Sequence, residues 1–225
     1  MHRTAARFVL VTGVLLAMVA VASTSAGTTS EAVVAPNGTL YGAPYGEWLG
    51  RWTAWAVTPP TATNPIVNPK DCKITPQPGE RVWYLTASAG GKLTQSCTIP
   101  SGRAIFVPIT GTIAYSETPK DTFAYLRPQA VATFEQTTVL EVSIDGRPVP
   151  GLRAYRSVSR NLVIPLPKAN IFQIPAGPTR FVDAFYSLLV TGLLPGMHTI
   201  VTYAEIRTPG QPVFKAGMTY RITIA

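Results

Sequence analysis

The stretch HTIVTYAEI, residues 198–206, has side chains that alternate as they do in a half-buried β-strand. The turn residues Leu194-Pro195-Gly196 come directly before it and mark where the strand begins. Because successive side chains of a strand point to opposite faces, the run presents two sets of residues. One set is His198, Ile200, Thr202, Ala204 and Ile206, and the other is Thr199, Val201, Tyr203 and Glu205.

Similar β-rich runs, each short and bounded by Gly or Pro, recur along the chain. They are RVWYLTA (81–87), RAIFVPI (103–109), TVLEVSI (138–144), PVPGLRAYR (148–156), FYSLLVT (185–191) and MTYRITI (218–224). Asp145-Gly146 lies between two of the runs and is typical of a tight hairpin. Many short strands separated by turns predict a mainly β fold, an antiparallel immunoglobulin-like β-sandwich, formed by a single domain over residues 44–225.

One or two helices are expected beside the strands. The stretch YGEWLGRWTAWAV, with Pro44 before it and Pro59-Pro60 after it, predicts an N-terminal helix over residues 44–57. Helical geometry places its three tryptophans on one narrow stripe, which either packs on the sandwich or forms a row on which sugar rings stack. A second helix is predicted around residues 121–135, where Pro128 would kink or divide it.

The N-terminus is typical of an exported protein. Its basic start, MHRTAAR, precedes the apolar run FVLVTGVLLAMVAVA (8–22) and the small residues STSAG. This pattern predicts a signal peptide over residues 1–26 and a secreted or cell-envelope location. The apolar run is short for a membrane span, which needs ~20 residues, but retention as an uncleaved anchor is the alternative. Residues 27–43 are small and polar, and we expect a flexible lead-in there.

The two cysteines, Cys72 and Cys97, are expected to form a disulfide, because an isolated pair in an exported protein is usually oxidised. Cys72 lies in a segment with six prolines, residues 59–78, which is expected to be an irregular loop. Zinc ligation by the two thiolates would need further ligands, and His198 is the one histidine after the signal peptide. We therefore expect no metal and no cofactor.

The charge balance is basic, with 19 Lys and Arg residues against 11 Asp and Glu residues. Between Asp145 and Asp183 there are six cations and no acid, namely Arg147, Arg153, Arg156, Arg160, Lys168 and Arg180. Such a cluster either forms a basic face for anionic envelope polymers or is simply a solvated surface. Nucleic acid is not an expected partner, since export removes it and no groove-reading motif is present.

Four segments within about Glu47 to Ile224 share a pattern with other proteins. They are EWLGRWTAW (47–55), CTIPSGRAIFVPI (97–109), VDAFYSLLVTGLLPGMHTIVTYAEI (182–206) and MTYRITI (218–224). Together they resemble a family of uncharacterised exported bacterial proteins, which has a Trp-rich N-terminal helix, a CTxPxG(K/R)AxFxPI segment and a C-terminal LPPGxHTI-type strand. After Asp183 this chain has AFY where the family pattern has GYW. The resemblance implies export and fold, and it implies no particular chemistry.

These observations predict a non-catalytic binding protein of the cell envelope or extracellular space. The expected ligand is a polysaccharide or another anionic envelope polymer, stacked on aromatic rings and steered by the basic cluster. The predicted ligand-binding residues are Glu47, Trp48, Arg51, Trp83, Tyr84, Arg153, Arg156 and Arg160.

Two alternatives stay open. The first is a secreted glycan or ester hydrolase that uses two of the carboxylates Glu47, Glu117 and Asp183, which are near Trp48, Tyr115 and Tyr186 in sequence. The second is a structural module that associates with itself. A Ser-His-Asp device would need His198 as its base, yet the chain has no G-x-S-x-G motif, so His198 is expected to be a half-buried strand residue.

Overall fold

The computed structural model describes residues 33–225 except 71 and 80. The predicted signal peptide lies outside the described residues. Among the residues that are described, none of the helices combines the length and the apolar character needed to cross a membrane.

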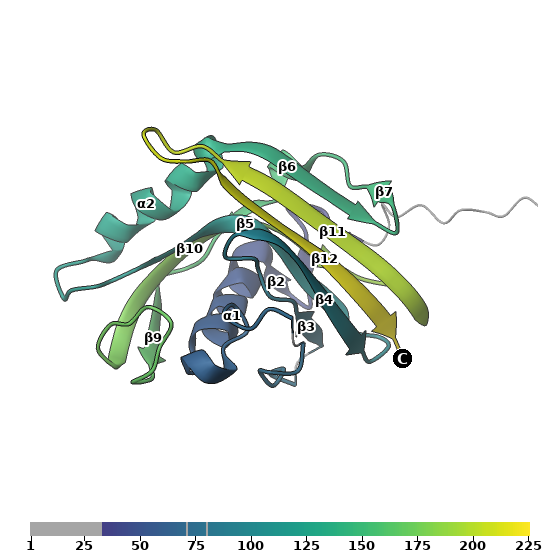
Figure 1. Cartoon of the computed structure of the whole chain (residues 1–225), viewed down its shortest axis with the longest axis horizontal. Coiled ribbons are helices and arrows are strands. Elements are labelled where there is room, and N and C mark those ends of the chain that lie inside the picture. The colour runs from purple at the N-terminus through teal and green to yellow at the C-terminus, as the bar shows by residue number, and fades with distance from the viewer. Residues whose placement is uncertain (1–32, 71, 80) are drawn as a thin grey trace, which may run out of the picture.

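The described residues are built mainly from β-strands (Figure 1). They also include two α-helices and two short 3-10 helices. In chain order the elements are β1 (Thr39–Leu40), β2 (Ala43–Pro44), α1 (Tyr45–Val57), η2 (Thr61–Thr63), β3 (Val82–Tyr84), β4 (Gly91–Ile99), β5 (Ala104–Tyr115), α2 (Phe123–Gln136), β6 (Thr137–Ile144), β7 (Arg147–Pro148), η3 (Leu152–Ala154), β8 (Arg156–Val158), β9 (Leu162–Leu166), β10 (Gly177–Val190), β11 (Gly196–Ile206) and β12 (Phe214–Ile224).

Two five-stranded sheets form a sandwich. The first has the order β3-β5-β10-β8, with β9 also paired to β10, and the second has the order β4-β12-β11-β6-β7. The prediction of a mainly β sandwich is confirmed. The sheets are mixed rather than purely antiparallel, because β3 runs parallel to β5 and β4 runs parallel to β12. The immunoglobulin-like arrangement stays a prediction.

The core between the sheets is made by the inner faces of both. Val107 and Leu188 from the first sheet meet Ile200 and Tyr220 from the second in one buried cluster. Helix α2 adds Leu126, Ala130 and Phe134 to the same cluster and packs on β5 and β10 (Figure 1). Alternation along β11 is as expected, with Ile200 buried and Val201 exposed. The sandwich therefore closes around a single core.

Helix α1 packs on the other face of the first sheet, where it forms a second core (Figure 1). Trp48 and Trp52 are 2% and 0% exposed, respectively. The Trp52 ring stacks on Phe106 and tilts against Phe185, and its indole N–H donates to the Leu85 carbonyl oxygen at 2.8 Å. Packing is therefore the role of these two tryptophans, as one of the two interpretations of the stripe predicts.

Glycine lets α1 approach the sheet closely. A Cβ atom added at Gly46 would lie 2.5 Å from the backbone oxygen of Val158 in β8. One turn later, a Cβ atom at Gly50 would lie 3.2 Å from the side chain of Leu162 in β9. The helix thus carries a glycine where it approaches β8 and β9 and a large ring, Trp52, where it packs on β5 and β10.

The structure differs from the sequence-based expectations in three places. Residues 33–43, expected to be a flexible lead-in, form β1, part of β2 and a bridge from Val33 to Val190. The run 148–156, expected to be a strand, contains η3 because Gly151 adopts a left-handed conformation (φ 67°). Pro128, expected to kink or divide the second helix, does not divide it, since α2 runs unbroken over Phe123–Gln136. The hairpin at Asp145-Gly146 is confirmed by the pairing of β6 with β7.

The disulfide between Cys72 and Cys97 is present, as predicted. It joins the proline-rich loop to β4, which lies at the edge of the second sheet. The loop is further held by Asn64, whose side-chain amide donates to the Ala56 carbonyl oxygen at 2.8 Å at the end of α1. These two attachments place the loop between α1 and β4.

Candidate functional site

The solvent-facing side of α1 carries a group of charged side chains. The Nε atom of Arg51 lies 3.4 Å from Oε1 of Glu47, one helical turn earlier, and Nη1 of Arg160 lies 3.7 Å from Oε2 of the same carboxylate. The Glu47 side chain is 27% exposed and that of Arg160 is 69% exposed. Exposed pairs of this kind add little to stability. The predicted residues Glu47, Arg51 and Arg160 are thus brought together at the surface.

The ring of Trp48 packs against Arg51 of this group. The guanidinium carbon of Arg51 lies 4.5 Å from the centroid of the Trp48 ring, which is a cation–π contact. The indole N–H of Trp48 donates to the Leu40 carbonyl oxygen at 3.0 Å. The ring is almost completely buried. It therefore orients Arg51 and offers no open face to a ligand.

Trp55 is the tryptophan of α1 that reaches the surface. Its indole N–H donates to the Pro76 carbonyl oxygen at 3.0 Å, and its ring tilts against that of Tyr84 at 5.7 Å between centroids. The ring lies in a groove of about 430 Å³ between α1 and the proline-rich loop. The groove is lined by Arg51, Ala54, Trp55, Thr58, Pro59, Thr75, Pro78 and Tyr84. An aromatic ring, a guanidinium group and hydroxyl groups therefore border one hollow.

The aromatic pair expected to carry the ligand, Trp83 and Tyr84, is mostly covered. Tyr84 is 2% exposed and makes an edge contact with Phe106, so its ring forms the back wall of the groove. Trp83 is half-buried and packs on the sandwich core instead. Its indole nitrogen is buried without a hydrogen-bond partner among the described residues. Tyr84 therefore has almost no exposed surface for stacking, and Trp83 does not line the groove.

The predicted basic face is divided among different elements. Arg153 donates to the carbonyl oxygens of Thr137 and Thr138, at 2.6 and 3.2 Å, at the start of β6. Nη1 of Arg156 lies 3.8 Å from Oε1 of Glu135 in α2. Arg160, by contrast, faces α1 through Glu47, as described above. Only Arg160 of these three arginines contributes to the group on α1.

Asp183 lies in the core beneath α1. It is 0% exposed, and the hydroxyl of Thr53 in α1 donates to its Oδ2 atom. Its backbone N–H donates to Ser159 Oγ at 3.0 Å, and Oδ1 has no partner in the part of the chain that the structure describes. Burial raises the pKa of Asp183 to about 7, against the opposing effect of the Thr53 hydrogen bond. The carboxyl group joins a helix to a sheet and does not face solvent.

The other two acids of the hydrolase alternative lie in different surroundings. Glu117 follows β5 and lines a groove of about 450 Å³ that includes Arg180. Glu47 is held between Arg51 and Arg160 on α1. Glycosidases need two carboxylates on either side of one bond, ~5–9.5 Å apart. The three predicted acids are not gathered around one hollow.

His198 is held at both ring nitrogens. Nδ1 lies 2.7 Å from Asp145 Oδ2, and Nε2 lies 2.8 Å from the Leu194 carbonyl oxygen. Partial burial lowers the pKa of His198, but the two hydrogen bonds and the charge of Asp145 outweigh it and raise the pKa overall. His198 is half-buried on β11, as expected, and it fixes the turns at this end of the sheet.

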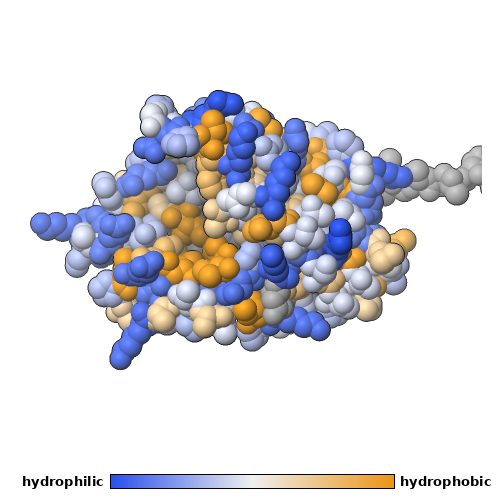
Figure 2. All heavy atoms as spheres, viewed as in Figure 1, coloured by the Kyte–Doolittle hydropathy of each residue, from blue (hydrophilic) through white to orange (hydrophobic). Residues whose placement is uncertain are grey.

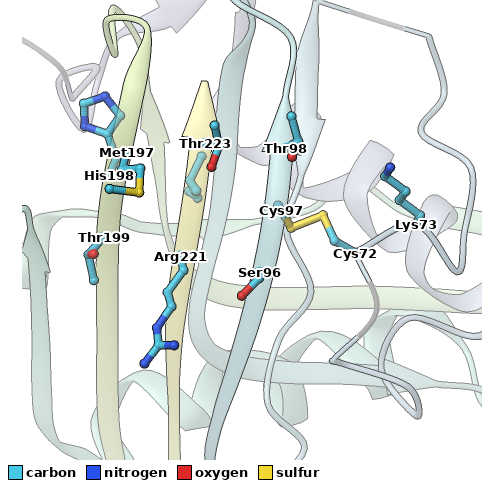
Figure 3. Close-up of a pocket in the computed structure, with 11 residues that line it drawn as sticks. Cys72, Lys73, Ser96, Cys97, Thr98, Met197, His198, Thr199, Arg221 and Thr223 are labelled. Atoms are coloured by element: carbon cyan, nitrogen blue, oxygen red, sulfur yellow. A yellow bond between two sulfur atoms is a disulfide. The ribbon is translucent and has the colours of Figure 1, made fainter. Parts of the chain in front are cut away.

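A further hollow of about 530 Å³ lies beside the disulfide, across β4, β12 and β11. Figure 3 shows Ser96, Arg221 and Thr199 side by side on the three strands, with the disulfide next to Ser96. The hollow is open to solvent, its lining mixes polar residues with Met197, Ile222 and the disulfide, and no Trp, Tyr or Phe is part of it. Within the described residues, no group of three or more His, Cys, Asp or Glu side chains is arranged to hold a metal ion.

The fold and the groove together define a β-sandwich protein whose covering helix carries an aromatic and arginine-lined surface site. No family model, no curated protein and no solved structure matches the chain. The geometry of the groove is therefore what indicates a function. Sequence reasoning did not single out Trp55 as the ring at the surface, because the proline-rich loop that builds the opposite wall has no periodic pattern.

Proposed function

We propose that the protein is an exported, non-catalytic carbohydrate-binding protein of the cell envelope or extracellular space. The observation that carries this proposal is the groove on α1, which both Trp55 and Arg51 line. Its volume of about 430 Å³ is within the range of small-molecule sites, ~300–1,000 Å³. The site would hold a short segment of a polysaccharide.

The groove supplies the two kinds of contact that a sugar needs. Trp55 is fixed by its hydrogen bond to Pro76 and by Tyr84 behind it, so the ring is a rigid apolar surface for the C–H face of a sugar. Arg51 is held by Glu47 and by the Trp48 ring, and its planar donors can bind hydroxyl or carboxylate oxygens. Both groups are ordered before a ligand arrives, which lowers the entropic cost of binding.

The charges around the groove favour an acidic polysaccharide. Arg51 and Arg160 share one carboxylate, Glu47, so this surface of α1 carries a net positive charge. The whole chain has a formal net charge of +8. A polymer with carboxylate or phosphate groups would be attracted over several ångströms, and the attraction would weaken with salt because exposed charges are screened.

Binding can be measured by co-sedimentation of the purified protein with insoluble envelope glycans, at low and at moderate salt. We expect retention at both, weaker at the higher salt, and at least a tenfold loss of affinity in Trp55→Ala. Arg51→Ala should weaken retention and reduce its dependence on salt. Tyr125→Ala is the matched control, because Tyr125 is 58% exposed on α2, a different element. The proposal fails if nothing is retained at either salt, or if Trp55→Ala binds as the parent does.

A further inference from the structure

A separate cavity lies between the proline-rich loop and the start of β4, and it differs in character from the groove on α1. Its volume is about 560 Å³. Its lining residues are Ile66, Val67, Asn68, Pro69, Lys70, Ile74, Ala89, Gly90 and Leu93. None of them lines the groove of Trp55. The proposed function leaves this cavity unexplained.

The lining is mainly apolar and continues from both cores of the protein. Leu93 packs against the core of the sandwich, whereas Ile66 packs against the core beneath α1. Val67 is 50% exposed at the surface. Figure 2 shows hydrophobic residues at the surface over the region of α1 and β9 as well. No residue of these two elements lines the cavity. A cavity with apolar walls and a free apolar side chain gains from an apolar occupant, since burial removes that surface from water.

The wall formed by the loop is fixed in place. The side-chain amide of Asn68 lies within hydrogen-bonding distance of the carbonyl oxygens of Thr61, Ala62 and Asn64, at 3.2 to 3.4 Å. The disulfide from Cys72 ties the loop between Lys70 and Ile74 to β4, the strand that supplies Leu93. Both walls of the cavity are therefore joined by a covalent bond, so the hollow exists before a ligand binds.

One charged side chain lines the cavity, and it sets the chemistry of the ligand. Lys70 is exposed and lines the cavity together with the apolar residues. A ligand with a hydrocarbon body and a single anionic group matches this arrangement. We propose that the cavity is a binding site for a free medium-chain fatty acid, with the chain on Ile74 and Leu93 and the carboxylate at Lys70. The site and its ligand are independent of the proposed carbohydrate groove.

Isothermal titration calorimetry of the full, oxidised protein with decanoate and with decanol tests the site. Both ligands should bind saturably at one site. Both have the same hydrocarbon chain, and each CH₂ group that it buries contributes roughly a fourfold gain in affinity. Lys70→Gln should weaken decanoate at least fivefold and leave decanol unchanged. Ile74→Ser should weaken both ligands. Val201→Ser is the control, since Val201 is 38% exposed on β11 and lines a different hollow.

Two further experiments test whether the disulfide is needed for binding and whether the ligand is a free fatty acid or a membrane lipid. Reduction with dithiothreitol should weaken decanoate severalfold, because it releases the loop from β4. Vesicles of phosphatidylglycerol, tested by flotation, should not retain the protein through Lys70 and Ile74. Binding of vesicles without binding of free decanoate would overturn the proposal. So would an absence of saturable decanoate binding, or an equal response of both ligands to Lys70→Gln, which is a surface substitution that leaves the core intact.

Discussion

Replacement of Asp183 by Asn should make the protein more stable at neutral and alkaline pH. Burial raises the pKa of the Asp183 carboxyl group from its ordinary value of 3.8 to about 7 in the folded protein. Between these pH values the folded state keeps a proton that the unfolded state has released. Stability therefore falls as pH rises through this window, by ~1.4 kcal/mol per pH unit. Over about three units the loss is on the order of 4 kcal/mol.

Asparagine cannot ionise and keeps an oxygen for the Thr53 hydroxyl, so the variant lacks this pH dependence. Denaturation in urea at about pH 5 and about pH 8 measures the effect, with the slope m checked for constancy. At the higher pH the variant should exceed the parent by several kcal/mol, and the difference should shrink as the pH falls towards 4. Asp121→Asn is the control with the opposite trend. The pKa of Asp121 is lowered, mainly by a hydrogen bond from the Thr118 backbone N–H, so its loss costs stability at high pH.

The reasoning would be refuted if the free energy of unfolding of the parent protein did not fall between about pH 5 and about pH 7.5 and changed with pH in the same way as that of Asp183→Asn. In that case the carboxylate would be ionised in the folded state, and water or another donor would have to reach it. The prediction thus tests the dry contact between α1 and β10 as well as the titration itself.

Three other predictions concern the same scaffold. The pKa of His198 is raised in the folded protein, so its pairing with Asp145 should contribute its full stabilisation below about pH 6.5 and lose it as the pH rises through the folded pKa. Melting curves recorded over a series of pH values should show this loss for the parent protein and not for Asp145→Asn. Gly46→Ala should destabilise by ~1–3 kcal/mol, because the new Cβ meets a backbone oxygen, whereas Gly50→Ala, which meets a flexible side chain, should cost less in chemical denaturation; equal costs would contradict this reading of the contact. Reduction of the disulfide, which closes a sequence separation of 25, should lower stability by ~3.5 kcal/mol on the chain-entropy model, and an unchanged urea midpoint would contradict it.

Much of the fold could be predicted from local patterns. The strands with clear alternation, such as β11, and the aromatic helix α1 were predicted close to their observed ends. The strand β4 was missed because its buried face includes Gln95, which interrupts the apolar pattern of an inner face. Two parallel pairings were missed because strand order depends on contacts far apart in sequence, which periodicity does not report.

The candidate site was only partly predictable. The pair Glu47 and Arg51 follows from helical spacing, since residues four apart are neighbours on a helix. Which tryptophan stays at the surface depends on where the proline-rich loop lies, and that is fixed by the disulfide and by Asn64. The burial of Asp183 was likewise hidden, because its neighbours in sequence face the sandwich core while its own side chain faces α1.

The position of the last strand has a consequence for how the chain reaches its native state. In the second sheet, β12 lies between β4 and β11, and among the described strands β4 pairs only with β12. Residues 91–99 can therefore join the sheet only after residues 216–224 are in place, and their pairing closes a very long loop. Contacts of such high sequence separation form slowly. Until residues 216–224 have been synthesised, β4 lacks the strand with which it pairs, so this sheet is completed late.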